Sequence, residues 1–553
     1  MFVRIKTTPN SPKKSVQIVQ SIRKGKTVSQ KIVRHIGTAL DSAELEKLIE
    51  LAEFIKVKLE SESNPTLFNP ETIAEMAIKS RKTKEKENEL KVNLKNLREE
   101  SRVVVGIHEV YGSIYRDLGF DKVIKNPKRN ASTNKKLFNI VMARIANPQS
   151  KRASVIELEK DFGVKISLEG VYKMMDKLDD NAIEKIERYS YDNAKEILKE
   201  KINVVFYDCT TLYFESFSED ELKQNGYSKD MKFNQPQVLL GLITTSEGLP
   251  IGYQVYTGSQ YEGSTLKDAT KKLKEKYEVE KIVVVADSGL LNQENIADLE
   301  KGGLEYILGA RIKNMPKKIE KELLDTSKYK KIEEGSNEKA IEISLSENKR
   351  LIVTYSKKRA EKDKKDREKA VKKLKEKMNK SKNPASLISN YGYKKYLKIT
   401  GETKVELDEV KLSKSSAWDG LHGIITNKKD FGIKQAVEHY RKLWQIEENF
   451  RISKHDLRIR PIYHWTPKRV RAHIAISFMA LVCVRHLELR VRRQYKKLSP
   501  EKIRNILLHS QCSILEDIST NKKYCIPSKT TRDMKKIYQT VGKKIDSVPF
   551  EIK

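Results

Sequence analysis

The sequence predicts a mixed α/β fold in which a sheet is sandwiched by helices, and two observations lead to this prediction. After residue 201, short apolar runs have the length and composition of buried strands, and stretches with helical periodicity separate the later runs. Strands are expected at 202–208, 237–245, 249–258, 281–287 and 304–311, and helices at 265–277 and 292–302. Three consecutive strands followed by helix, strand, helix and strand form the element order of an RNase H-like core.

Three segments precede this core, which we place at 201–311. Residues 1–73 alternate apolar and polar side chains in short runs and then become helical, which predicts a small β/α unit. Residues 74–100 are charge-dense and weakly apolar, which predicts a solvated helical connector. Residues 101–200 carry helical periodicity, so we expect a helical domain that either binds DNA or packs with a basic outer face.

The core is interrupted at 312–430 by a β-rich insertion that surrounds a very basic helix at 357–382. This helix contains fourteen Lys and Arg residues and five acidic residues, and it has one thin apolar edge. It suits an arm that contacts the phosphate backbone of DNA, while a solvated surface helix is an equally open interpretation. The core resumes at 431–490, and residues 491–553 are expected to form a C-terminal tail.

The chain is long enough for several domains and is strongly basic. Its 553 residues include 110 Lys and Arg against 76 Asp and Glu, which gives a net charge of +34. This charge favours a polyanion as the partner, although coding bias and solubility alone would produce the same excess.

The cysteines and the apolar stretches indicate the compartment. The four cysteines lie far apart or in no CxxC pair, so we expect neither a disulfide framework nor a zinc site. The N-terminus lacks the apolar region of a signal peptide, and the longest apolar stretch, 473–484, is too short to span a bilayer. The sequence therefore predicts a soluble protein of a reducing cytoplasm that makes no use of a membrane.

Two aspartates end predicted strands of the core. Asp208 follows the apolar run 204–207, and Asp287 follows the run 282–286. Either one alone is most simply the first residue of a turn. Because this fold places the two strands side by side, however, two converging carboxylates would repel each other unless a cation lay between them.

A third carboxylate, Glu447, comes from the strongly helical stretch 434–457. The spacing puts five side chains on one face of this helix: Tyr440, Trp444, Glu447, Arg451 and Lys454. We expect Glu447 to lie near the core, where a carboxylate is costly unless it is paired or binds a metal. An ion pair between Glu447 and Arg451 is the simpler alternative, and packing is the simpler role for Trp444.

Carboxylates from two strands and a helix can hold two Mg²⁺ ions roughly 3.5–4 Å apart, one activating the attacking oxygen and one stabilising the leaving oxygen. This arrangement serves phosphodiester chemistry. An all-oxygen site suits Mg²⁺, with Mn²⁺ as a substitute, and no cluster of His and Cys residues in the sequence argues for zinc.

Several stretches of the chain resemble one family of enzymes. They are VVFYDCTTLYFES, GLPIGYQVYTGSQYEGSTL, VVVADSGLLNQENI, WDGLHGIITN and YRKLWQIEENFRISKHDLRIRPIYHW, which together cover about 202–465, with a further similar stretch at the N-terminus. The chain resembles the bacterial DDE insertion-sequence transposases with the YREK signature, the superfamily typified by insertion sequence four, and is most similar to its longer-chain branch. The resemblance implies an RNase H-like catalytic core, a β-rich insertion before the catalytic Glu, and terminal-repeat DNA as the substrate.

The resemblance also implies roles for individual residues. Asp208, Asp287 and Glu447 match the metal-binding triad. Tyr440 and Lys454 match the Tyr and Lys of YREK, which are associated with phosphates at the transposon end. The chain departs from the motif at the Arg position, where it has Leu443, and Arg441 and Arg451 are the candidates to replace that Arg in DNA binding.

We therefore expect a transposase that binds the terminal inverted repeats of its element and hydrolyses a phosphodiester to expose a 3′-OH. That hydroxyl then attacks target DNA in a second in-line displacement. A dimer or higher oligomer is expected when two ends are paired, at the nucleoid of a bacterial cytoplasm. The alternatives are an RNase H-like nuclease that cuts without joining, and a non-catalytic basic DNA-binding protein.

Overall fold

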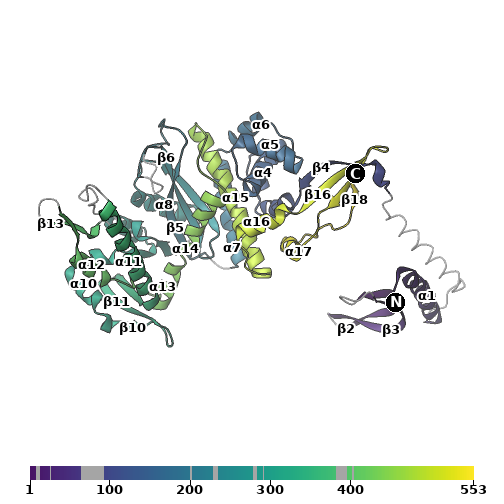
Figure 1. The fold of residues 1–553 in the computed structure, drawn as a ribbon, viewed down its shortest axis with the longest axis horizontal. Helices are drawn as coiled ribbons and strands as arrows, with labels where there is room; N and C mark the ends of the chain where they lie inside the picture. The colour runs from purple at the N-terminus through teal and green to yellow at the C-terminus, as the bar shows by residue number, and fades with distance from the viewer. Residues whose placement is uncertain are drawn as a thin grey trace. The chain divides into compact units, whose positions relative to one another are not determined.

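The computed structural model describes most of the chain in two compact units (Figure 1). The described residues are 1–7, 13–24, 27–63, 92–199, 202–227, 234–277, 283–290, 292–380, 395–400 and 404–552. One unit comprises Met1–Arg98, Glu516–Lys523 and Phe550–Lys553, and the other comprises Glu99–Leu515 and Tyr524–Pro549. The three acidic candidates all belong to the larger unit.

The smaller unit contains the β/α arrangement that the sequence predicts for its N-terminus. Strands β1 (Phe2–Thr7), β2 (Lys14–Lys24) and β3 (Thr27–Ala39) form an antiparallel sheet in the order β1-β2-β3, and α1 (Ser42–Ser63) packs against it. The buried side chains Val16, Ile18 and Ala52 form its small core. The Asp41 carboxylate accepts the backbone N–H of Glu44, so the helix begins with a side-chain cap.

Most of the predicted helical connector, 74–91, lies outside the described residues. The helical prediction is wrong for its last part, because a 3₁₀ turn at Leu94–Asn96 leads into strand β4 (Leu97–Val104). Strand β4 joins a four-stranded sheet in the order β18-β17-β16-β4. The charge density that favoured a solvated helix therefore belongs, at this end, to an edge strand with exposed charged side chains.

Residues 107–199 are mainly helical, as the periodicity of 101–200 predicts, whereas 101–104 belong to β4. After a π-helical turn at Ile107–Tyr111 the helices are α3 (Gly112–Asp117), α4 (Ala131–Ala146), α5 (Lys151–Phe162), α6 (Leu168–Met175) and α7 (Asp180–Leu198). Their apolar faces join one large buried cluster with α14 and α15, whose bounds are given below. Residue 200, and residue 201 at the start of the predicted core, lie outside the described residues.

A nine-stranded mixed sheet forms the centre of the larger unit. Its order is β10-β11-β12-β15-β9-β8-β5-β6-β7, with β5–β8 and β8–β9 parallel and the other pairs antiparallel. The strands are β5 (Val204–Tyr213), β6 (Gln237–Thr245), β7 (Pro250–Thr257), β8 (Val283–Ala286), β9 (Glu305–Ala310), β10 (Lys330–Lys331), β11 (Glu338–Ser346), β12 (Lys349–Ser356) and β15 (Leu421–Thr426). All five strands predicted for the core are confirmed.

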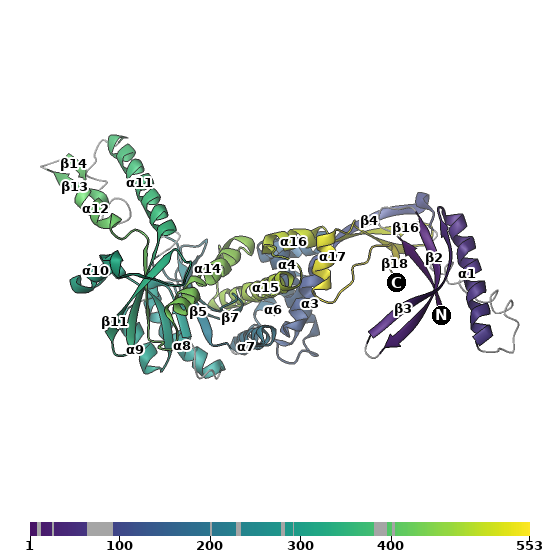
Figure 2. The same ribbon diagram turned by 90° about the horizontal axis from the view of Figure 1, so that it is seen from below.

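The insertion continues this sheet. Strand β15 pairs with β9, and β12 pairs with β15, so the strands of the insertion extend the sheet beyond β9 and cover an edge that would otherwise be open. The rest of the insertion comprises α10 (Lys317–Leu324), α11 (Lys357–Lys380), the hairpin β13 (Leu397–Thr400) and β14 (Lys404–Leu407), and α12 (Glu409–Ser416). Figure 2 shows α11 beside α12 and this hairpin, against which Leu374 is buried.

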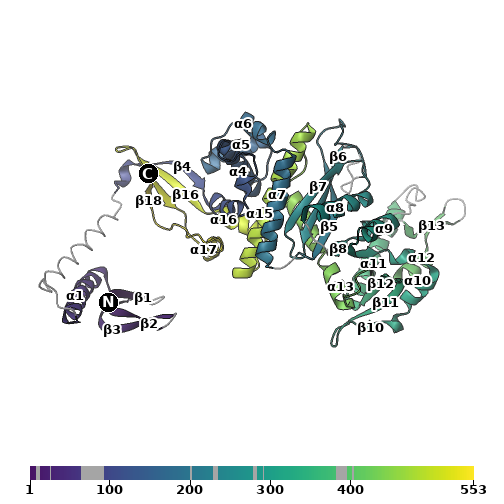
Figure 3. The ribbon, with the colours of Figure 1, turned by 180° about the vertical axis from the view of Figure 1, so that it is seen from behind.

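Helices cover both faces of the sheet, because side chains alternate between two buried clusters along each strand. Phe206 and Val285 face α14 (Trp444–Arg451) and α15 (Pro467–Gln494), whereas Tyr207 and Val284 face α8 (Glu262–Tyr277) and α9 (Gln293–Lys301) (Figures 1 and 3). The apolar stretch 473–484 lies within α15 and is buried throughout. Among the described helices, including α15, none is long and apolar enough to cross a membrane.

The chain after α15 is folded and is not the tail that the sequence suggests. Its elements are α16 (Pro500–Leu508), β16 (Gln511–Asp517), β17 (Lys522–Pro527), α17 (Arg532–Gln539) and β18 (Phe550–Ile552). Ile503, Leu507 and Ile537 are fully buried in the main core.

The expectation that no disulfide is present is wrong for one pair of cysteines. Cys512 in β16 and Cys525 in β17 are joined, with their Cα atoms 5.7 Å apart. Their separation of 13 residues carries no sign of this contact, which depends on the two strands lying side by side in the four-stranded sheet. Cys209 and Cys483 are buried and are not disulfide-bonded.

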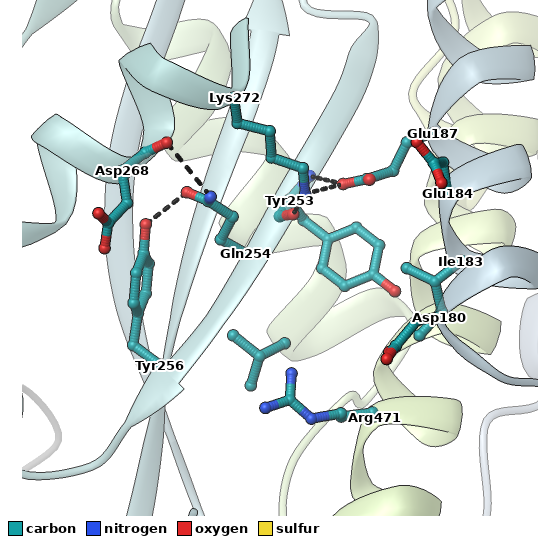
Figure 4. A pocket seen from close by; sticks show the side chains of 11 residues that line it. Asp180, Ile183, Glu184, Glu187, Tyr253, Gln254, Tyr256, Asp268, Lys272 and Arg471 are labelled. Atoms are coloured by element: carbon teal, nitrogen blue, oxygen red, sulfur yellow. Dashed lines mark hydrogen bonds and ion pairs between the residues drawn. The ribbon is translucent and has the colours of Figure 1, made fainter. Parts of the chain in front are cut away.

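A buried ion pair closes the open edge of the sheet at β7. The Glu187 carboxylate from α7 accepts the backbone N–H of Tyr253 at 3.0 Å, and the Lys272 ammonium from α8 donates to the Tyr253 carbonyl at 2.9 Å and to Glu187 at 2.7 Å. Figure 4 shows these groups beside a cavity of about 350 Å³. Helix α7 lies along β7 and covers this edge of the sheet (Figure 3). The ion pair supplies hydrogen-bond partners for the Tyr253 N–H and carbonyl, which would otherwise be buried without any.

We predict that Lys272→Met lowers the free energy of unfolding by about 3 kcal/mol, because it leaves the Glu187 carboxylate, which is 1% exposed, without its cation. Lys271→Met, at the exposed neighbouring position of α8, is the matched control and should change the free energy by less than about 0.5 kcal/mol. Urea denaturation of both variants measures the difference. Equal losses in the two variants would contradict a structural role for the buried pair.

Candidate active site

Asp208 lies in the middle of β5, on the sheet face that is covered by α14. Its neighbours Tyr207 and Cys209 belong to the cluster on the opposite face, whereas Phe206 and Leu212 pack with α14 and α15. The side chain of Asp208 is half-buried, and its carboxylate accepts the backbone N–H of Cys209 at 2.8 Å. The prediction that the strand ends at this residue is wrong, since β5 continues to Tyr213.

Asp287 stands beside Asp208 because β5 and β8 pair in parallel. The register pairs Phe206 with Val285, and each aspartate follows two residues later on its strand. Asp287 is exposed, and the Tyr440 hydroxyl donates a hydrogen bond to its carboxylate at 3.2 Å. Gly309 in β9 makes this approach possible, since a Cβ there would meet the Tyr440 hydroxyl.

Glu447 comes from a helical segment that is less regular than the sequence predicts. The expected helix at 434–457 is divided into α13 (Ile433–Arg441), α14 and a π-helical turn at Ile452–Asp456. Between α13 and α14 the backbone hydrogen bonds join residues three apart, as in a 3₁₀ helix. One example is the bond from the Gln445 N–H to the Lys442 carbonyl. The backbone stays right-handed, so Tyr440 and Glu447 still face the same way.

One cavity of about 920 Å³ brings together four of the predicted residues. These are Asp287, Tyr440, Arg441 and Glu447. Asp208, Arg451 and Lys454 do not line this cavity, and Lys454 is half-buried in the π-helical turn. Within the described part of the chain, no three side chains of the His, Cys, Asp and Glu types converge closely enough to hold a metal ion.

Two expectations for this helix are wrong, the position of Glu447 near the core and the packing of Trp444, and the alternative ion pair between Glu447 and Arg451 is not formed. Arg451 does not pair with Glu447: its guanidinium donates two hydrogen bonds of 2.8 Å to Glu448 and lies 3.4 Å from Asp456. Glu447 is instead exposed to the cavity, not held near the core. Trp444, for which packing was expected, is 49% exposed and lines the same cavity.

The motif position occupied by Leu443 is a core position in this chain. Leu443 is 7% exposed and packs in the main cluster with Ile446 and Phe450. Of the two arginines proposed to replace the missing Arg, Arg441 lines the cavity and pairs with Glu338 at 2.7 Å, whereas Arg451 is held by Glu448.

The basic helix α11 forms part of the wall of the cavity that Asp287 and Glu447 also line. Five of its cations line the cavity, Lys358 and, at helical spacing, Arg359, Lys362, Lys365 and Lys369, together with three of its acidic residues, Glu361, Asp363 and Asp366. Two contacts fix the helix in place, a double hydrogen bond from Arg367 to Asp419 and the acceptance of the Gly420 N–H by Asp363 at 3.0 Å. The charge count of the sequence identified this helix, but its position next to Asp287 and Glu447 had no sequence signal.

His422 in β15 is a second group that the sequence analysis did not single out, although it lies within a stretch that carries the resemblance. Its ring lies 5.1 Å from the ring of Tyr440. Burial, together with the nearby Arg359, lowers the pKa of His422 to about 4, so the ring is neutral at pH 7. Burial and the negative charge of Asp287 raise the pKa of Tyr440, so its hydroxyl keeps its proton for the bond to Asp287.

Comparison with known proteins identifies the family. The family model of the transposase DDE domain matches residues 199–483, a range that includes Asp208, Asp287 and Glu447. Among solved structures, the piggyBac transposase synaptic complex with hairpin DNA is similar at 9% identity, with 73% of this chain and 76% of that chain covered and a TM-score of 0.37. The Mos1 transposase paired-end complex with the left transposon end is similar at 10% identity, covering 45% and 70% of the two chains with a TM-score of 0.14.

No curated protein matches the sequence. The family model spans more than half of the residues, and the match stands on the sequence itself. The chain belongs to the transposase DDE domain family.

Proposed function

We propose that this transposase mobilises a bacterial insertion sequence by cutting DNA at terminal inverted repeats and joining the freed 3′ ends to target DNA. The observation that carries the proposal is that Asp287 and Glu447 open onto one cavity while Asp208 lies beside Asp287 on the same sheet face. We further propose that the enzyme belongs to the long-chain branch of the insertion-sequence-four superfamily, and that it works as a dimer or larger assembly on paired ends.

The strand arrangement supports an RNase H-like core. In the order β7-β6-β5-β8-β9, the first three strands are antiparallel and the last three are parallel. Three consecutive strands followed by two helix-strand units produce this order, with the two aspartates on the central pair. The third carboxylate then comes from the helix that follows the insertion.

Asp208, Asp287 and Glu447 are the residues that would hold Mg²⁺, with Mn²⁺ as a substitute. They fit in kind, because three carboxylates supply only the oxygen donors that Mg²⁺ prefers. Bound there, two ions would activate an attacking oxygen and neutralise the leaving one. Asp287 and Glu447 are exposed to the cavity, so their carboxylates are accessible to an ion from solvent.

The side chains around the carboxylates would position the DNA. Tyr440 holds the Asp287 carboxylate through its hydroxyl and so fixes the direction of its free oxygen. Arg441, Arg359 and the α11 lysines face the cavity and would bind backbone phosphates. We assign the role of the missing YREK Arg to Arg441, and we keep Tyr440 and Lys454 as contacts to phosphates at the transposon end.

The triad is tested by three isosteric substitutions. We expect Asp208→Asn, Asp287→Asn and Glu447→Gln each to reduce Mg²⁺-dependent cleavage of end DNA at least about a thousandfold, because each removes a charged donor. Binding of end DNA should change less than about threefold, since it rests on basic contacts. Single-turnover cleavage and a gel-shift titration measure the two quantities.

Glu448→Gln is the matched control for this set, because Glu448 is the adjacent carboxylate on α14 and pairs with Arg451. It should retain cleavage. A Glu447→Gln protein that cleaves at a near wild-type rate would remove the third carboxylate from the mechanism. Cleavage without transfer of the 3′ end into a second duplex would identify a nuclease that does not join DNA.

The wall formed by α11 is tested by neutralising one face at a time. Replacing Lys362, Lys365 and Lys369 by Ala should weaken binding to all DNA sequences alike and flatten the slope of log affinity against log salt by about two to three units. Replacing Lys357, Lys364 and Lys375, which do not line the cavity, removes the same charge and should flatten it by less than about one unit. Equal effects from both faces would favour the solvated-helix interpretation.

Arg441 and Arg451 are expected to differ in what they contribute. Arg441→Gln should slow cleavage of end DNA at least about tenfold with little change in Tm, since its side chain is half exposed at the cavity. Arg451→Gln should instead lower the Tm, because Glu448 and Asp456 lose their cation. Thermal unfolding and single-turnover rates of both variants separate these effects, and the reverse pattern would overturn the assignment.

A further inference from the structure

A second cavity of the larger unit, of about 280 Å³, is lined by cations on several sides. It lies between the end of α4, the start of α5, α6, α15 and the segment that follows the π-helical turn. Its basic lining residues are Arg144, Lys151, Arg152, Arg458, Arg460, His464 and His473. Among the described residues that line it, none is acidic.

Two of these cations are buried without a negative partner in the cavity. Arg144 and Lys151 are each 4% exposed. The Arg144 guanidinium donates to the backbone carbonyls of Leu457 and Arg458 at 3.3 and 3.2 Å, and the Lys151 ammonium lies 3.5 Å from Nδ1 of His473. These partners are neutral, so they satisfy hydrogen bonds but leave the buried charge uncompensated.

The ionisable groups of the cavity are buried together and repel one another as cations. Burial and the charge of Arg144 lower the pKa of Lys151, and burial and both cations lower the pKa of His473. The same causes lower the pKa of His464 to about 3. A negative ligand in the cavity would reverse the repulsion and stabilise the charged forms of these groups.

The start of α5 adds donors to this positive site. Ser150 caps the helix by accepting the N–H of Ala153, and Lys151 is its first residue. The free N–H groups of a helix N-terminus favour anions, and α5 runs for twelve residues. Gln149, Ser150 and Arg152 also line the cavity, so the first residues of α5 lie at its wall.

We propose that this cavity binds a phosphate oxyanion between Arg144, Lys151 and the N-terminus of α5. The phosphate belongs either to a DNA backbone or to a free inorganic ion, since both present the same tetrahedral oxygens. An oxyanion supplies the charge that the two buried cations lack.

The position of the cavity relative to β5 favours DNA as the source, and this step rests on the proposed function. Arg460 lies 5.3 Å from the ring of Tyr213, and the Ile462 N–H donates to the Tyr213 carbonyl. Tyr213 is five residues along the strand from Asp208, about 17 Å at the rise of a β-strand. That length corresponds to about five base pairs of duplex, so a DNA segment that runs from the candidate site along β5 would reach the cavity within about half a helical turn.

Inorganic phosphate tests the site on the full-length protein without DNA. Raising phosphate at constant ionic strength, with chloride as the balancing anion, should raise the Tm of the wild type, because a ligand bound only to the folded state stabilises it. Lys151→Met should lose at least about half of this rise. Lys160→Met, an exposed position of the same helix about 13 Å further along, should keep it.

Arg460→Gln is a second variant of a residue that lines the cavity, and it should also reduce the phosphate-dependent rise in Tm. It keeps the test possible if Lys151→Met does not fold. A Lys151→Met or Arg460→Gln protein that folds and keeps the full rise, or a wild type whose Tm follows ionic strength alone, would overturn the proposal.

Duplex DNA distinguishes the two sources of phosphate. If a backbone phosphate fills the cavity, Lys151→Met and Arg460→Gln should each reduce the slope of log affinity against log salt by about one unit, while Lys160→Met leaves it unchanged. An unchanged slope combined with a lost phosphate response identifies a free ion as the ligand. Because the phosphate arm requires no cleavage, it stands even if the triad is not catalytic.

Discussion

The parallel pairing of β5 with β8 is the constraint on which the candidate site depends. Side chains alternate along each strand, so the register that pairs Phe206 with Val285 sets both Asp208 and Asp287 on one face. A slip of one residue would turn one aspartate into the opposite apolar cluster. Ile446 and Phe450 pack α14 against the same face and thereby set the location of Glu447.

Charge is arranged around this face in two different ways. At the larger cavity, carboxylates and cations line the same walls, and α11 is held by its own ion pair with Asp419. At the smaller cavity, buried cations have only neutral partners. The high net charge of the chain is therefore more than a diffuse attraction for polyanions, because part of it is fixed at defined places in the fold.

The sequence predicts the core strands well, since buried strands leave continuous apolar runs that depend on local pattern alone. Long-range pairing leaves no such pattern. The disulfide between Cys512 and Cys525 and the pairing of β15 with β9 both join separate segments of the chain. The local sequence around each segment does not show which other segment it contacts. For the site, the sequence locates the acidic residues but not their neighbours. Arg451 can reach a carboxylate three or four residues away, and the difference between Glu447 and Glu448 is decided by how α14 packs.

Because the sheet continues through the insertion, the distance between the strand that leads into α11 and the strand that leads to Asp287 is fixed. Strand β12 leads directly into α11 at Lys357, and it is three strand spacings from β8, about 14 Å. Hydrogen bonds join β12 to β15, β15 to β9 and β9 to β8. Strands β12 and β8 therefore cannot move apart without breaking the sheet. The side of the cavity formed by α11 does not belong to this ladder, and its position depends instead on the contact of Arg367 with Asp419 and on the burial of Leu374.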